Sequence, residues 1–400
     1  MEGNNLQNNS VIQPSSNASD LSSQVKDEIS ILERKLDNSD LPPDLMEKAR
    51  AMIIRLKKMS IGGSYSNEYE PVSEYINWII QLPWDIYTKD NLDMAHAKES
   101  LSKYHYGLDP VKNRILEYLA VIHLQAMNNK AKAEELAAQG GTAESNSDKM
   151  KKLTGNSSNA PILCFVGIQG VGKTSLAKSI AIALNRGFMR IPLGGLGGVA
   201  EIRGRARGTI DPEPGQIIKA LIRTGSMNPL ILLDEIDKVS SDTGLRADVM
   251  AALLEILDPE QNSTFIDKYL DYPVDLSKCM FITTANNLGG ISAALLDRLE
   301  VIRFGSYNDN EKMTIAKDYL LPKVRKATGL TKEQLDFAPD VWPLVIRPLG
   351  FDAGVRQLER TLTDLARKVA LKIVQGVTDG VKVTKENFRE FIPEDIGIYS

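Results

Sequence analysis

The sequence predicts an α/β fold in which a buried parallel sheet is preceded and followed by helical regions. Three observations support this prediction. Short apolar runs alternate with helical patterns between residues 161 and 304. The first of these runs leads into a glycine-rich loop and then into a helical pattern. On both sides of this region, apolar residues recur every three or four positions, as they do on one face of a helix.

The predicted strands are short runs of mostly apolar residues that are separated by helical patterns. They are Pro161–Val166, Phe188–Ile191, Leu230–Leu233, Cys279–Thr284 and Glu300–Phe304. Runs without strict alternation of apolar and polar residues are typical of strands that are buried on both faces. Strands joined through helices pair in parallel. We therefore expect a parallel sheet that helices cover on both faces.

The region before the sheet is predicted to form a helical arm over residues 24–103. A Leu-Pro-Pro sequence at residues 41–43 marks a break between its first two helices. Further helices are predicted at Val72–Leu82 and near Asp93–Lys103. Residues 1–23 are rich in Asn, Ser and Gln, a composition that predicts a disordered tail.

The sheet belongs to a predicted domain over residues 104–305, in which residues 129–160 form a flexible linker insert. From residue 306 the pattern becomes helical again, which predicts a small helical domain over 306–392 and a tail over 393–400. Its expected elements are helices at Glu311–Lys326, Pro339–Arg347 and Gly354–Gln375 and a short strand at Val381–Val383.

The composition excludes several classes of protein. Hydrophobic residues make up 42% of the chain and charged residues 25%, which are the proportions of an ordinary globular protein. The formal net charge is −4, so no general positive charge favours a nucleic-acid partner. Two cysteines are too few for a disulfide framework or a zinc site. No apolar run is long enough to span a membrane and no signal peptide is present, so we expect a cytoplasmic protein without a membrane partner.

The glycine-rich loop at residues 167–174 has the spacing G-x-x-x-x-G-K-[ST] of a phosphate-binding loop. Such a loop points backbone N–H groups at a phosphate, and the following helix adds partial positive charge. Lys173 is expected to reach the β- and γ-phosphates of a nucleotide, and Thr174 to supply a hydroxyl to Mg²⁺. The candidate nucleotide-binding residues are Gly167, Gly170, Val171, Gly172, Lys173, Thr174 and Ser175.

Two carboxylates end the predicted strand Leu230–Leu233. Asp234 and Glu235 follow it directly, at the edge where parallel sheets bind ligands. We expect Asp234 to hold Mg²⁺ and Glu235 to activate an attacking water. An apolar run followed by Asp-Glu is weak support on its own, and the combination with the phosphate-binding loop is strong.

A longer pattern then connects these motifs. Leu-Leu-Asp-Glu-Ile-Asp-Lys at 232–238 is followed by Ala-Leu-Leu-Glu-Ile-Leu-Asp-Pro-Glu-Gln-Asn-Ser-Thr-Phe at 252–265 and Leu-Leu-Asp-Arg at 295–298. Together with His-Tyr-Gly-Leu at 105–108 and Ala-Gly-Val-Arg-Gln-Leu-Glu-Arg at 353–360, this pattern resembles the ATPase module of the Lon protease family. The resemblance implies an AAA+ P-loop NTPase fold with a helical lid and arm, which binds ATP and Mg²⁺ and assembles into a homo-oligomer, most simply a hexameric ring.

The resemblance also implies roles for four further residues. Asn286 matches the sensor that positions the attacking water, and Arg356 matches the second sensor, in the lid. Arg298 matches the arginine finger, which acts on the γ-phosphate of a neighbouring subunit. Tyr106 and its neighbours match the region that packs against adenine.

The sequence departs from the family pattern in its loops. Ile168 and Gln169 stand where the family usually has two prolines, at variable positions of the phosphate-binding loop. Thr209 stands where the family's substrate-gripping pore loop carries an aromatic residue, whereas Ile210 remains apolar. Because an aromatic ring offers a large contact area to a polypeptide, Thr209 implies a weaker grip on protein substrates.

Two domains of the family are not expected in this sequence, namely the substrate-recognition domain before the arm and the Ser–Lys protease domain after the lid. We therefore expect an ATPase without a peptidase site of its own. Three interpretations remain open. The chain is a motor that remodels or unfolds proteins in quality control, the ATPase part of a split or truncated Lon protease that acts with a separate peptidase chain, or a nucleotide-dependent scaffold with little translocation.

Overall fold

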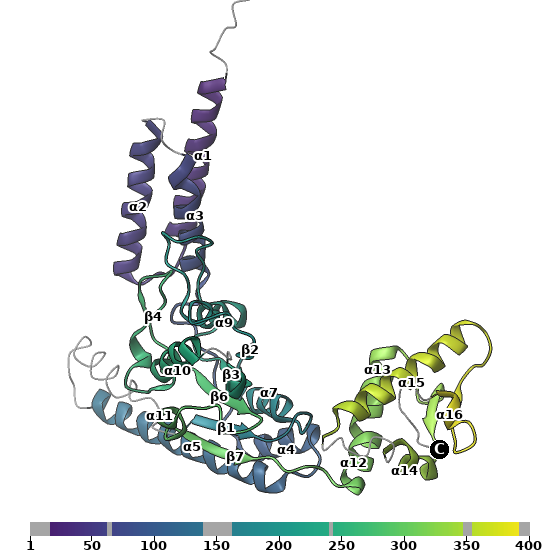
Figure 1. The fold of residues 1–400 in the computed structure, drawn as a ribbon. Helices are drawn as coiled ribbons and strands as arrows, with labels where there is room; N and C mark the ends of the chain where they lie inside the picture. The colour runs from purple at the N-terminus through teal and green to yellow at the C-terminus, as the bar shows by residue number, and fades with distance from the viewer. Residues whose placement is uncertain (1–16, 62–65, 139–161, 240–242, 347–353, 392–400) are drawn as a thin grey trace, which may run out of the picture.

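The computed structural model describes residues 17–61, 66–138, 162–239, 243–346 and 354–391. The chain has three parts (Figure 1): a protruding arm of helices, a central α/β domain and a lid at the C-terminal end. The predicted α/β class is confirmed. Among the described residues, no helix combines the length and the apolar character needed to cross a bilayer.

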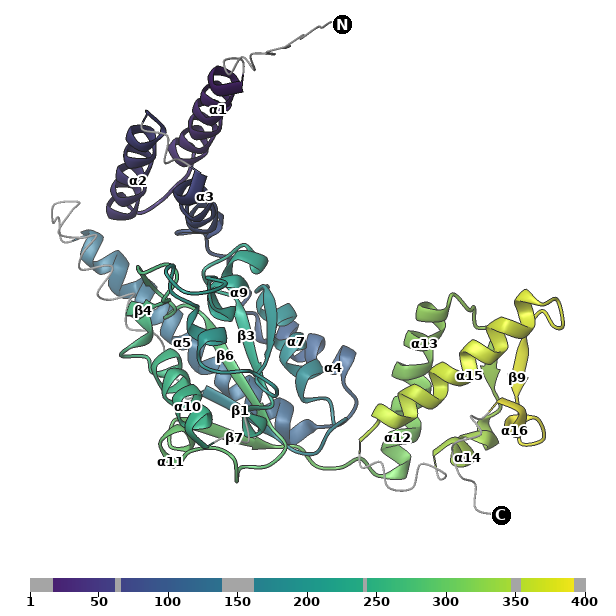
Figure 2. The same cartoon turned by 45° about the horizontal axis from the view of Figure 1, so that its top comes forward.

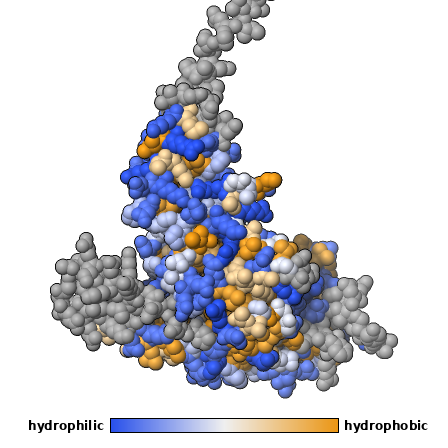
Figure 3. Space-filling view, turned by 60° about the vertical axis from the view of Figure 1, so that its left-hand side comes forward, coloured by the Kyte–Doolittle hydropathy of each residue, from blue (hydrophilic) through white to orange (hydrophobic). Residues whose placement is uncertain are grey.

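The arm is a bundle of three helices, α1 (Asn17–Asp37), α2 (Pro43–Ile61) and α3 (Ser66–Gln81). Helix α1 begins inside the predicted tail of residues 1–23, so residues 17–23 are helical and the rest of that prediction lies outside the described residues. The apolar positions at helical spacing face one another, and Ile29, Ala49 and Ile76 are buried. On the face shown in Figure 3 the arm is mainly hydrophilic.

The central sheet contains five parallel strands in the order β2-β3-β6-β1-β7. The strands are β1 (Ile162–Val166), β2 (Phe188–Pro192), β3 (Leu230–Asp234), β6 (Met280–Ala285) and β7 (Leu299–Arg303). All five predicted strands are therefore confirmed to within a few residues. β1 and β3 lie on either side of β6, so the loops that follow these three strands meet at one edge of the sheet.

Helices cover the two faces of the sheet (Figure 2). The buried side chains on the two faces form two separate hydrophobic clusters. One layer consists of α4 (Met94–Tyr104), α5 (Asp109–Ala138) and α7 (Lys173–Leu184). The other contains α9 (Gln216–Thr224) and α10 (Thr243–Leu257) and continues into the arm. The short helical elements are α8 (Ala200–Arg203), η1 (Ile236–Lys238), η2 (Asn262–Thr264) and α11 (Ala293–Leu296).

Helix α4 corrects the predicted boundary between arm and α/β domain. The sequence placed residues 24–103 in the arm, but Ala97 and Leu101 of α4 are buried against α5 and α7. Asp93 caps this helix by accepting a hydrogen bond from the backbone N–H of Ala95 at 2.9 Å. The arm therefore ends near residue 82. The predicted insert 129–160 starts as helix, since α5 continues to Ala138, and residues 139–160 lie outside the described residues.

The lid has its own hydrophobic core, as its helical pattern predicted. Its elements are α12 (Asp309–Ile315), the π-helical segment η3 (Ala316–Leu320), α13 (Leu321–Thr328), β8 (Leu335–Phe337), η4 (Pro339–Val341), α14 (Trp342–Ile346), α15 (Arg356–Val374), β9 (Val381–Val383) and α16 (Phe388–Phe391). The predicted strand β9 pairs in parallel with β8, which the sequence did not predict. The antiparallel pair β4 (Phe265–Ile266) and β5 (Pro273–Val274) was also not predicted, because two-residue strands are too short to show a periodicity.

Candidate nucleotide-binding site

The glycine-rich loop joins β1 to α7 and leaves the start of that helix available to an anion. Gly170 and Gly172 have φ values of +85° and +94°, a conformation that glycine adopts without strain. Gly172 is the N-cap of α7, and no side chain caps this end of the helix. The first N–H groups of α7 therefore lack a side-chain acceptor and lie beside the cavity, as a phosphate requires.

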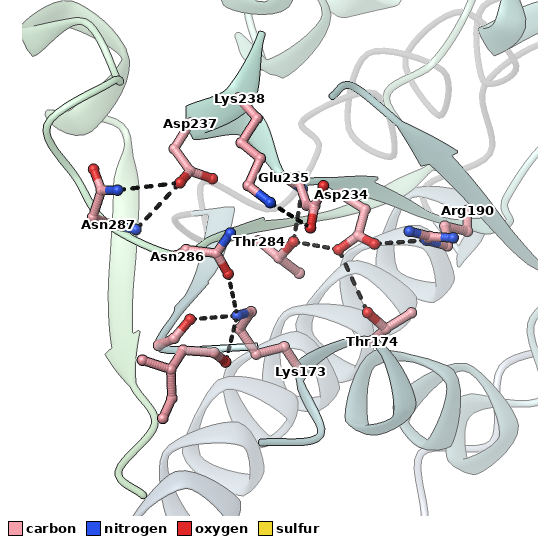
Figure 4. A network of polar contacts seen from close by, with 12 residues as sticks. Lys173, Thr174, Arg190, Asp234, Glu235, Asp237, Lys238, Thr284, Asn286 and Asn287 are labelled. Atoms are coloured by element: carbon pink, nitrogen blue, oxygen red, sulfur yellow. Dashed lines mark hydrogen bonds and ion pairs between the residues drawn. The ribbon is translucent and has the colours of Figure 1, made fainter. Parts of the chain in front are cut away.

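The side chain of Lys173 points back over this loop (Figure 4). Its ammonium donates hydrogen bonds to the carbonyl oxygen of Gly167, to that of Ile168 at 3.0 Å and to Oδ1 of Asn286 at 3.0 Å. Burial lowers the pKa of Lys173, and the charge of Asp234 opposes this shift. All three acceptors are uncharged oxygens, so none of these hydrogen bonds pairs the Lys173 ammonium with an anion.

Asp234, at the end of β3, is buried with only 4% of its surface exposed. One carboxylate oxygen accepts a hydrogen bond from the hydroxyl of Thr284 and lies 3.5 Å from the hydroxyl of Thr174. The other oxygen forms an ion pair with Nε of Arg190 at 2.6 Å. The predicted pair of metal-binding residues, Thr174 and Asp234, is thus brought together from two elements (Figure 4).

Glu235 occupies a left-handed backbone conformation, with φ of +59°. This conformation is uncommon for a residue with a side chain, and such strain concentrates at functional sites. Its N–H donates to the hydroxyl of Thr284 at 2.9 Å, and its carboxylate lies 3.2 Å from the ammonium of Lys238. Thr284 therefore contacts both carboxylate residues, one through its proton and the other through its oxygen.

A cavity of about 650 Å³ lies over the loop, between the α/β domain and the lid. The lid approaches the loop closely, since the N–H of Val355 donates to the carbonyl of Gly170 at 3.1 Å. A Cβ on Gly354 would lie 2.6 Å from the carbonyl oxygen of Gln169, so only glycine fits there. The predicted site residues that line the cavity are Tyr106, Gly170, Gly172, Lys173, Thr174, Ser175, Asp234, Glu235, Asn286 and Arg356.

Three further residues beside this cavity were not predicted individually as site residues, although one of them, His105, adjoins Tyr106. His105 shares a hydrogen bond of 2.9 Å between its Nε2 and the hydroxyl of Ser179, and burial lowers its pKa to about 4. Tyr307 donates to the carbonyl of Val171 at 3.0 Å, and burial raises its pKa to about 12. Arg190 pairs with Asp234. The sequence did offer a signal for Arg190 as a site residue, because it is the one charged residue in the otherwise apolar strand β2.

The remaining predicted residues lie outside the cavity. Gly167 packs so closely under Phe304 that a Cβ would meet its carbonyl oxygen at 2.8 Å, and Val171 is fully buried. Arg298 pairs with Asp258 at 3.0 Å and does not line the cavity. The predicted pore-loop residues are exposed, with 87% of Ile210 accessible.

The chemistry of this site fits a nucleotide with its metal. Uncapped helical N–H groups and the Lys173 ammonium are suited to phosphates. The Thr174 hydroxyl and a carboxylate oxygen of Asp234 are the hard ligands that Mg²⁺ prefers. The volume also lies within the range of small-molecule pockets, about 300–1,000 Å³.

Comparison with known proteins agrees with the fold and with the site. Residues 163–307 match the ATPase family associated with various cellular activities (AAA), and residues 326–382 match the Lon protease AAA+ ATPase lid domain. The chain is 46% identical over 366 residues to Lon protease of Dictyoglomus thermophilum, across 91% of this chain and 42% of that protein. It is 41% identical over 372 residues to Lon protease of Bacillus thuringiensis and 42% identical over 365 residues to Lon protease 2 of Thermus thermophilus.

The chain spans about 42% of the length of these three relatives, while the matches cover at least 91% of the chain itself. The AAA match contains the glycine-rich loop, Asp234 and Glu235, and the lid match contains α15 beside the cavity. The chain therefore belongs to the AAA+ ATPases and consists of an AAA domain and a lid domain of the Lon type, preceded by a helical arm.

Proposed function

We propose that this chain binds ATP with Mg²⁺ in the cavity above the glycine-rich loop and hydrolyses it. The observation that carries the proposal is the meeting of Lys173, Asp234 and Glu235 at one edge of the sheet, beneath the lid. Thr174 and Asp234 would hold Mg²⁺, which would neutralise charge on the phosphate oxygens when bound. A separate carboxylate, Glu235, is left to orient and deprotonate water.

The lid and the neighbouring strand complete the site in this proposal. Asn286 extends from the end of β6 and already contacts the ammonium of Lys173, so it lies near the phosphate position and is suited to orient water. Arg356 belongs to the lid helix α15 and lines the same cavity, so it links the nucleotide to the position of the lid. Tyr106 lines the cavity from the segment between α4 and α5 and is assigned to the adenine.

The test is ATP turnover and ATP binding in two variants. Glu235→Gln keeps the phosphate and metal ligands but removes the base, so it should bind ATP and lower the turnover rate by about a hundredfold or more. Lys173→Ala should lose binding, because it removes the cation from the phosphate site. A Glu235→Gln chain that turns over like wild type contradicts the assigned role of Glu235.

We further propose that hydrolysis drives the remodelling or unfolding of protein substrates by a ring of these chains. The exposed segment that carries Thr209 and Ile210 is the assigned substrate contact. The relatives are named Lon proteases, which favours a second candidate, in which this module supplies ATP-driven motion to a peptidase. Adding a peptidase subunit and measuring ATP-dependent degradation of casein distinguishes this candidate from a motor without proteolysis.

Thr209→Tyr separates a motor from a nucleotide-dependent scaffold. The ring of Tyr adds about 1–3 kcal/mol of substrate contact. The Thr209 hydroxyl donates to the carbonyl of Ala206 at 2.7 Å, and Tyr loses this local bond. We expect stronger stimulation of ATPase activity by an unfolded polypeptide and faster unfolding of a stable reporter, with nearly unchanged basal activity. If neither wild type nor Thr209→Tyr responds to polypeptide, the scaffold is the better description.

A further inference from the structure

Arg190 and Asp234 lie on the same face of the sheet although 44 positions separate them in the chain. The parallel register places Arg190 opposite Leu232, two residues before Asp234 on β3. Side chains two residues apart on a strand point to the same face. Both side chains therefore point to the face that α7 covers, and the guanidinium meets the carboxylate beside Thr174 (Figure 4).

The ion pair with Arg190 gives Asp234 a positive partner where the other nearby cations are engaged elsewhere. Lys173 donates to three uncharged oxygens and Lys238 contacts Glu235. Among the ion pairs of the described residues, Arg190 is the cation in contact with Asp234, at 2.6 Å. A carboxylate that is 4% exposed requires such a partner, because a buried charge without one is costly.

The two members of the pair differ in their freedom to move. The side chain of Asp234 is 5% exposed, whereas that of Arg190 is 49% exposed and lines the cavity. The carboxylate is held in addition by Thr284, but no second ion pair holds Arg190 among the described residues. The guanidinium is therefore the partner that gives way when another cation approaches this carboxylate.

We propose that Arg190 is a positioning residue that serves as the counter-ion of Asp234 when no metal is bound and that competes with Mg²⁺ for this carboxylate. This inference rests on the proposed function, in which Asp234 holds the metal. Arg190 holds the carboxylate in place beneath the cavity. Its like charge also opposes the metal, so the site fills only at a higher Mg²⁺ concentration than it would without Arg190.

The experiment compares wild type with Arg190→Gln, Arg190→Lys and the control Arg186→Gln. Arg186 forms an ion pair with Asp90 at 2.6 Å, with a side chain 12% exposed, and does not line the cavity. Thermal unfolding midpoints are measured in ADP with EDTA and in ADP with Mg²⁺. Binding of a fluorescent ADP analogue is titrated with Mg²⁺ in parallel, so that both measurements are independent of turnover.

In EDTA, Arg190→Gln should lower the unfolding midpoint by about 2–4 °C, and Mg²⁺ should remove this deficit. The half-saturating Mg²⁺ concentration should fall about fivefold. Arg190→Lys keeps the charge and should resemble wild type. Arg186→Gln should show the same deficit in both solutions, because its partner binds no metal.

The inference is overturned if Arg190→Gln lowers the unfolding midpoint equally with and without Mg²⁺ and if the half-saturating Mg²⁺ concentration is unchanged or higher. The ion pair is then purely structural. Wild type that binds the ADP analogue identically with and without Mg²⁺ refutes the metal site itself, and the inference fails with it. The first outcome leaves the proposed ATPase function intact, so the two failures are distinguishable.

Discussion

His105 is the residue whose burial has the clearest consequence for the nucleotide site. Its imidazole shares a hydrogen bond with Ser179 in the middle of α7, and a Cβ on Gly172 would lie 3.9 Å from its Nδ1. The ammonium of Lys112 also lies close, donating to the carbonyl of His105 at 2.7 Å. Desolvation first, and then the charge of Lys112, lower the pKa of His105 to about 4. The imidazole is therefore neutral at pH 7 and holds the middle of α7 through Ser179 without adding charge.

This depressed pKa predicts a pH dependence of stability. Between pH 6.5 and about 4, His105 is protonated in the unfolded chain but neutral in the folded chain. The contribution of neutral His105 to the free energy of unfolding is therefore complete above pH 6.5 and is lost as the pH falls toward 4. The size of the loss is about 3 kcal/mol. The difference between the free energies of unfolding of wild type and of His105→Gln should therefore decrease as the pH is lowered from 6.5 to about 4. His96→Gln, on the exposed side of α4, controls for the loss of a histidine, and a pH-independent difference for His105→Gln contradicts the prediction.

At the scale of elements, the segment between α8 and α9 that carries Thr209 is fixed at its base and exposed at its tip. The buried carboxylate of Asp267 accepts hydrogen bonds from the backbone N–H of Gly215 at 2.7 Å and from that of Tyr269 at 2.8 Å. The guanidinium of Arg207 lies 4.1 Å from the ring centre of Tyr75 in the arm helix α3. The loop is therefore anchored to both the α/β domain and the arm, while Thr209 stays exposed.

Asp267→Asn should release the base of this loop. Asparagine replaces one carboxylate oxygen by an NH₂ group, which cannot accept the hydrogen bond that the N–H of Gly215 donates. A buried donor that loses its acceptor costs about 1–3 kcal/mol of stability. Limited trypsin cleavage after Arg205 and Arg207 should therefore become about tenfold faster or more. Asp271→Asn is the matched control in the same segment, because the Asp271 side chain is 67% exposed and its ion pairs contribute little. Equal cleavage rates for the two variants contradict the assigned anchor.

At the scale of the whole molecule, the position of Arg298 suits an action outside its own cavity. It lies between α11 and β7, where it pairs with buried Asp258, and it does not line the cavity of its own chain. Its side chain is 41% exposed, so a neighbouring copy can reach it. The roles of Arg298 and of a ring assembly remain predictions.

Arg298→Lys tests this assignment while retaining a cation for Asp258. A lysine lacks the planar guanidinium that stabilises charge on several phosphate oxygens, so turnover should fall about a thousandfold with unchanged ATP affinity. Mixing it with Glu235→Gln chains should restore activity, because a mixed interface combines an intact Glu235 with an intact Arg298. Light scattering measures the assembly size in parallel. Full activity of a strictly monomeric chain contradicts the shared site.

The sequence by itself determined the features that depend on neighbouring residues. Runs of apolar residues predicted the five strands of the sheet, and the spacing of glycines with Lys173 and Thr174 predicted the loop that joins β1 to α7. Such local patterns follow from the periodicity of strands and helices and from backbone conformation, which only a few adjacent residues control. The longer pattern from residue 232 to residue 298 added the family, which the comparisons confirm.

Only the tertiary structure decided which distant residues meet. Helix α4 has the pattern of an arm helix but packs beside α7, because an amphipathic face does not specify its partner. Arg190 contacts Asp234 because β2 is the neighbour of β3, and strand order is not written in the strands themselves. The anchoring of Gly215 by Asp267 likewise joins residues 52 positions apart. These contacts arise from long-range packing, whose free energy depends on the whole fold rather than on any one segment.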